Sequence, residues 1–139
     1  MLHFKKIQWL KVITYSIVLS ISVVFVVAIL TFSLLNLGFD FTEDATIFLL
    51  ASYFCSFAIT YFAYFTLAKK QFYHPFQHAV FVYILNIAIG FTLDFLIPIA
   101  LITWEVFIVE LFAYIAILVV ATKHGNKYQN RYRFIDNAV

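Results

Sequence analysis

The sequence has little charge, almost no cysteine and few glycines. Of its 139 residues, 12% are charged and 65% are apolar, whereas soluble domains average about 25% charged residues. This composition excludes a soluble globular domain, and the abundance of apolar side chains excludes disorder. The single cysteine, Cys55, excludes an intramolecular disulfide. We therefore expect one membrane domain over residues 1–139.

Long apolar runs divide the chain into four predicted spans. No charged residue occurs at 12–39 or at 45–68, and about 20 helical residues cross a hydrocarbon layer of about 30 Å. The run 79–121 is too long for one helix, so we expect a tight turn near Pro98. The spans are placed at 12–35, 45–68, 76–97 and 103–122, and Gly125 is predicted to end the last helix. The expected fold is an all-α integral membrane protein with four transmembrane helices arranged as two hairpins.

The basic residues predict the orientation of these spans. All nine Lys and Arg residues precede the first span, separate the second from the third, or follow the fourth. Because positive charge stays on the cytoplasmic side, both termini are expected inside, in a bacterial inner membrane with an anionic inner leaflet. A net charge of +2 is too small to indicate nucleic acid as a partner.

One carboxylate is predicted to lie within the membrane. Glu110 falls about 18 Å from the inner edge of the fourth span, where an ionised acid costs roughly 2.5–3.5 kcal/mol. The predicted turn sets Glu110 level with Gly90, which leaves space for it, and we expect Asn86 and Tyr83 to donate hydrogen bonds to it. The candidate coupling residues are Glu110, Asp94, Glu105, Asn86, Tyr83 and Tyr114. Three roles stay open: interhelical hydrogen bonding, coupling to a proton or cation, and contact with a partner subunit.

Small and polar residues mark a predicted packing face. Ser52, Ser56 and Thr60 recur every four residues along the second span, and Gly90 lies on the polar face of the third. Helices in lipid associate through such residues. The face is interpreted as the seam of the bundle, with the lining of a path as the alternative.

Two histidines, His74 and His78, are four residues apart and share a face if a helix begins near Pro75. A zinc site needs a third protein ligand, which the sequence does not supply, so contact with lipid headgroups is favoured over metal binding. No cofactor is expected. The chain has no His-Glu-x-x-His motif and no glycine-rich loop, and we predict that it is not an enzyme.

In size and number of spans the chain resembles the GtrA-like group, which is associated with the movement of polyprenyl-linked sugars. Residues 65–72 contain the aromatic and basic parts of that group's signature without its asparagine, and the fourth span lacks the signature. The favoured function is that of an accessory, immunity-type or complex subunit acting through helix contacts, with itself or with another membrane protein. The alternative is a small homo-oligomeric transporter or flippase that uses Glu110.

Overall fold

A computed structural model describes residues 7–40, 45–70, 74–96 and 104–136. Within these ranges the chain forms four helices and no strand: α1 (Trp9–Asn36), α2 (Ala45–Lys70), α3 (Pro75–Leu96) and α4 (Trp104–Asp136). Each helix is long and apolar enough to cross a membrane. The prediction of an all-helical chain with four helices long and apolar enough to span a membrane is therefore confirmed for the described residues. The predicted turn at Pro98 lies outside the described residues.

Local sequence accounts for several helix ends. α1 ends at Asn36 and is followed by Gly38 at φ 79°, a left-handed conformation that costs glycine little. α3 begins at Pro75, whose fixed φ and missing N–H suit the first helical position. His74 precedes that proline with φ 49°, so it lies outside the helix and is not on one helix face with His78.

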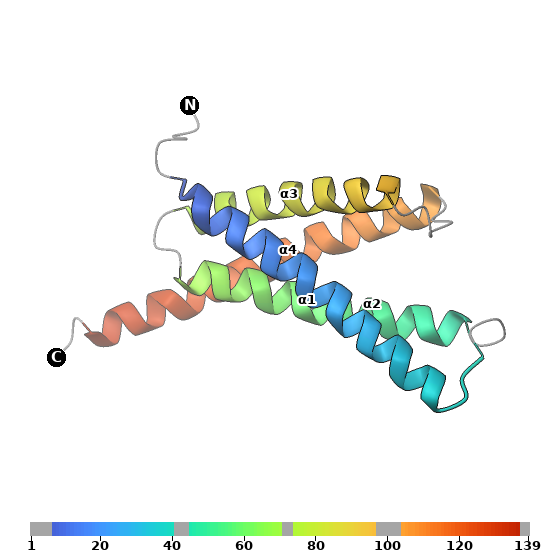
Figure 1. The fold of residues 1–139 in the computed structure, drawn as a ribbon. Coiled ribbons are helices and arrows are strands. Elements are labelled where there is room, and N and C mark those ends of the chain that lie inside the picture. The colour runs from blue at the N-terminus through green and yellow to red at the C-terminus, as the bar shows by residue number, and fades with distance from the viewer. Residues whose placement is uncertain (1–6, 41–44, 71–73, 97–103, 137–139) are drawn as a thin grey trace.

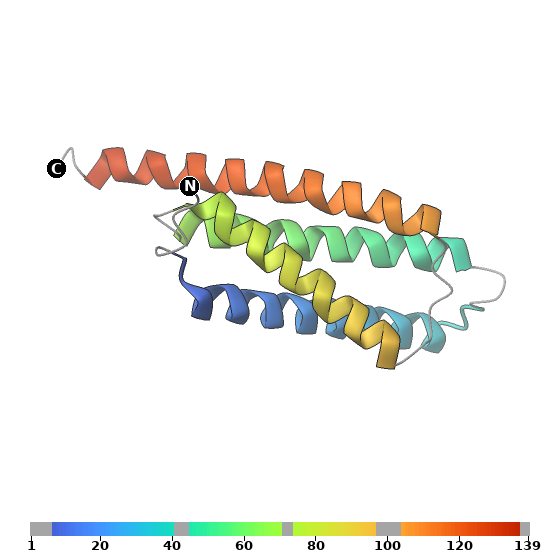
Figure 2. The ribbon, with the colours of Figure 1, turned by 90° about the horizontal axis from the view of Figure 1, so that it is seen from above.

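Successive helices run in opposite directions along the bundle (Figure 1). The closest packing does not follow the chain order, since α2 makes its most extensive contact with α4, and α1 packs against both α2 and α3. α1 and α4 make no contact within the described ranges. These two helices lie diagonally opposite each other across the bundle (Figure 2).

The helices are tightly packed at one end of the bundle only. Figure 1 shows them close together where α1 begins and spread apart where α1 ends and α4 begins. Each helix contributes buried side chains to the packed end, and they include Leu19, Tyr64, Val82 and Leu118. No described residue of the other end, at 20–40, 46–55, 83–92 or 107–117, is buried. The bundle is thus a funnel with a closed base and an open end.

Gly125 has a different role from the predicted one. The prediction that it ends the fourth helix is wrong, because α4 continues to Asp136. Gly125 is buried against α2, and a Cβ built on it would lie 2.5 Å from the Phe65 carbonyl oxygen and 2.8 Å from the Ala68 Cβ. The missing side chain therefore lets two backbones approach closely, as small residues do between membrane helices.

Candidate functional site

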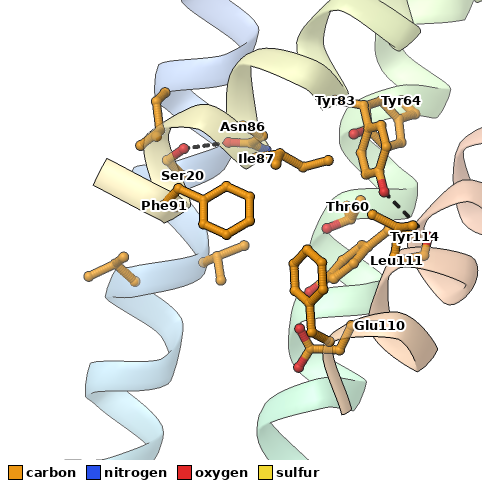
Figure 3. Close-up of a pocket in the computed structure, with 15 residues that line it drawn as sticks. Ser20, Thr60, Tyr64, Tyr83, Asn86, Ile87, Phe91, Glu110, Leu111 and Tyr114 are labelled. Atoms are coloured by element: carbon orange, nitrogen blue, oxygen red, sulfur yellow. Dashed lines mark hydrogen bonds between the residues drawn. The ribbon is translucent and has the colours of Figure 1, made fainter. Parts of the chain in front are cut away.

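A cavity of about 300 Å³ lies in the centre of the bundle, above the packed base. All four helices line it (Figure 3), with Ser20 from α1, Thr60 from α2, Asn86 from α3 and Glu110 from α4. Its volume is at the lower end of the range for small-molecule sites, about 300–1,000 Å³. The walls are mostly apolar, so the few polar groups in them determine what the cavity can bind.

Among the residues whose side chains the structure describes, Glu110 is the only formally charged one in the lining of the cavity. It lies six residues after the start of α4, about 9 Å along the helix axis, and is half-buried. The phenolic hydroxyl of Tyr53, on α2, donates a hydrogen bond to its carboxylate. This bond partly replaces the water that the carboxylate loses in the membrane.

Aromatic rings continue from this pair along the seam between α2 and α4. Tyr53 stacks on Phe57 with ring centroids 5.9 Å apart, and Phe57 meets Tyr114 edge-on at 5.2 Å. The carboxylate is thus held at the end of an ordered aromatic row, and this row fixes the position of its hydrogen-bond donor.

The predicted donors to Glu110 are wrong. The Asn86 amide oxygen accepts a hydrogen bond from the Ser20 hydroxyl at 2.5 Å, which ties α3 to α1. The Tyr83 hydroxyl donates to the Leu111 carbonyl oxygen at 3.3 Å, which ties α3 to α4. Both residues line the cavity with Glu110 (Figure 3), but each is directed to a different partner. The rise per residue sets the position of each residue along its own helix, whereas the direction of each side chain depends on helix rotation.

The other candidate residues fall into two groups. Tyr114, Gly90 and Thr60 line the cavity, and a Cβ on Gly90 would meet nothing within 4 Å. Ser56 and Thr60 are buried, and the Ser52 hydroxyl is enclosed with no hydrogen-bond partner among the described side chains. For Asp94 and Glu105 the structure describes only the backbone, at the open ends of α3 and α4.

His78 is a structural residue of the packed base. Its side chain is fully buried, its Nε2 accepts a hydrogen bond from the Gln8 backbone N–H at 3.0 Å, and its Nδ1 lies 3.0 Å from the His74 carbonyl oxygen. The expected contact of His78 with lipid headgroups is therefore wrong. In the part of the chain that the structure describes, no three His, Cys, Asp or Glu side chains gather as a metal site.

Tyr53 is the site residue that sequence reasoning missed. It is one of nine tyrosines and lies 57 positions from Glu110, so neither composition nor spacing distinguishes it. The one available signal was the polar stripe of α2, since Tyr53 directly follows Ser52 and lies one turn before Phe57. Comparisons with known proteins return no match, since no protein-family model, no curated protein and no solved structure resembles this chain.

Proposed function

We propose that this protein is a small transporter of the bacterial inner membrane that admits a cation from the outer face and couples its movement to Glu110. The observation that supports this proposal is a carboxylate in the wall of a central cavity within the spanning helices. Such a group costs roughly 2.5–3.5 kcal/mol to insert. A neutral residue would pack helices without that cost, so a ligand or proton that compensates the charge gives the carboxylate a use.

The distribution of charge supports an orientation with both termini in the cytoplasm. Lys69 and Lys70 end α2 at the packed base, and the same end of α4 carries exposed Lys123 and Lys127. α4 continues beyond this end of the bundle (Figure 2). We place this basic end at the anionic inner leaflet, following the positive-inside rule. The funnel then opens outward, and the packed base separates the cavity from the cytoplasm.

Flux in proteoliposomes tests the proposal. The protein is reconstituted with an imposed pH gradient, and uptake of methylammonium, guanidinium and tetraphenylphosphonium is measured. We expect uptake of at least one of these probes by the unmodified protein and its loss in Glu110→Gln. The matched control is Asp40→Asn, which removes an exposed carboxylate outside the cavity and should transport normally. Equal flux with Glu110→Gln would exclude the carboxylate from transport.

The second candidate is an accessory or immunity-type subunit without catalysis, bound to itself or to another membrane protein. It is favoured by the absence of buried residues from the described part of the open end, since helices of a partner could complete the packing there. Crosslinking in cells followed by mass spectrometry separates the two candidates. Crosslinks between α1 residues 20–36 and one defined partner protein, together with unchanged flux in Glu110→Gln, would favour the accessory-subunit function. Self-crosslinks with Glu110-dependent flux would favour a homo-oligomeric transporter.

A further inference from the structure

We infer that the cavity binds a small monovalent organic cation with an aromatic or branched apolar group, rather than a metal ion. This inference rests on the proposed function and specifies its substrate class. Charge is the first argument, because Glu110 is the single formally charged side chain among the described residues that line the cavity. One carboxylate balances one positive charge, whereas a divalent cation would keep an uncompensated charge in an apolar environment.

Three of the oxygen-bearing side chains in the lining are already engaged in hydrogen bonds to other helices. Ca²⁺ takes about six to eight oxygen ligands and Mg²⁺ about six in octahedral geometry. The Asn86 oxygen accepts from Ser20, and the Tyr83 hydroxyl is directed to the Leu111 carbonyl. Glu110 itself accepts from Tyr53. These three groups are thus committed to neighbouring helices, which leaves fewer oxygens for a metal ion that needs about six or more.

Aromatic rings form the walls opposite and beside the carboxylate. Phe91 of α3 and Phe107 of α4 line the cavity with ring centroids 5.5 Å apart. Tyr64 and Tyr114 line its deeper part with Thr60 (Figure 3). A cation over an aromatic face is attracted by the ring quadrupole, and the attraction is stronger when the pair is shielded from water. This surface suits an ammonium whose substituents are apolar.

The size of the cavity limits the ligand further. About 300 Å³ is near the minimum for small-molecule sites, at about 300–1,000 Å³. A quaternary ammonium with one benzyl group is of the appropriate size and charge. Benzyltrimethylammonium is therefore the probe, and neopentylbenzene is its neutral control, because a carbon atom replaces the nitrogen with the same shape.

Binding to the full-length protein in nanodiscs is measured by saturation-transfer NMR and calorimetry. We expect benzyltrimethylammonium to bind at least about tenfold more tightly than neopentylbenzene, since only the cation is attracted by the Glu110 carboxylate. Glu110→Gln should lower the affinity for the cation about tenfold or more and leave the affinity for the neutral molecule unchanged. Phe91→Leu should lower the affinity for the cation about fivefold. Asp40→Asn should leave the affinity for both molecules unchanged.

The comparison of cation and neutral molecule needs no variant, so it holds even if Glu110→Gln fails to fold. Equal binding of the two molecules would overturn the inference, as would competition for the site by Mg²⁺ alone at equal concentration. These results are independent of the transport assay. Loss of flux in Glu110→Gln without binding of benzyltrimethylammonium would reject the substrate class and retain the transporter, whereas binding without any flux would reject the transporter.

Discussion

Gly125 of α4 lies directly against the backbone of Phe65 in α2, because a methyl group at Gly125 would stand 2.5 Å from the Phe65 carbonyl oxygen. The contact belongs to the most extensive helix pair of the bundle. Ala121, four residues earlier, and Ala68 on the facing helix are both fully buried. A small residue at each of these positions brings the α2 and α4 backbones together at the closed base of the funnel.

Gly125→Ala should therefore destabilise the bundle by about 1–3 kcal/mol, the usual cost of overpacking. The matched control is Gly90→Ala, where the new Cβ would meet nothing within 4 Å. That change should be neutral or stabilise α3 by about 0.5–1 kcal/mol, since alanine restricts the unfolded chain. Thermal melting followed by circular dichroism in detergent checks both variants. Equal melting temperatures for the two would contradict the close approach at Gly125.

Tyr53→Phe should lower the free energy of unfolding, because the variant loses the hydrogen bond to Glu110. Hydrogen bonds to charged groups contribute about 1.5–3 kcal/mol, and a double-mutant cycle with Glu110→Gln should give a coupling energy of at least about 0.5 kcal/mol. The control cycle uses Tyr61→Phe, because the Tyr61 hydroxyl lies 2.8 Å from His124 Nδ1 instead. The unfolding free-energy changes of Tyr61→Phe and Glu110→Gln should be additive. Denaturant titration in detergent measures both cycles, and additivity of Tyr53 with Glu110 would disprove the pairing.

Two serines of α1 should respond differently to truncation. The Ser20 hydroxyl donates to Asn86, whereas the buried Ser16 hydroxyl has no hydrogen-bond partner among the residues described. Ser20→Ala should cost about 0.5–1.5 kcal/mol, in the range for hydrogen bonds between residues in folded proteins. Ser16→Ala should be neutral or stabilising, because it removes a polar group that the packed base does not satisfy. The difference between the two unfolding free energies is the measurement, and a larger loss for Ser16→Ala would be the opposite of this expectation.

The orientation is testable with single cysteines in a Cys55→Ala background. Asp40 and His74 are both exposed, at opposite ends of the bundle. We expect a membrane-impermeant maleimide to label Asp40→Cys in intact spheroplasts and to label His74→Cys only after lysis. Unfolded protein at full reactivity is the labelling standard. The reverse pattern would place the basic end outside, and the funnel would then open to the cytoplasm.

Sequence reasoning identified much of the lining of the cavity but not its contacts. Glu110, Asn86, Tyr83, Tyr114, Gly90 and Thr60 were all candidates, and all six line the same cavity. Their levels along the bundle follow from the rise per residue and the position of a predicted turn. The rise per residue could not identify the residue that donates a hydrogen bond to Glu110. Tyr53 contacts it because α2 packs against α4, and no periodicity within one helix reports the rotation of another helix.

His78 and Gly125 illustrate the same limit at the packed base. A histidine near lysines predicts contact with water or headgroups, yet His78 is fully buried and accepts the Gln8 N–H. A glycine after an apolar run predicts a helix end, yet Gly125 is an internal residue of α4 at a close helix contact. Both residues are explained by neighbours from other helices.

The sequence by itself determined that the chain is built of four long apolar helices and where most of them begin and end, although it missed the C-terminal extension of α4 to Asp136. These follow from local quantities, because lipid cannot satisfy backbone hydrogen bonds and long uncharged runs must become helices. Only the tertiary structure decided that the helices converge at one end, that a cavity remains between them, and that Tyr53 meets Glu110 there. Lipid is as apolar as the side chains, so hydrophobicity does not choose which helix faces meet. That choice depends on the fit of small and polar side chains from different helices.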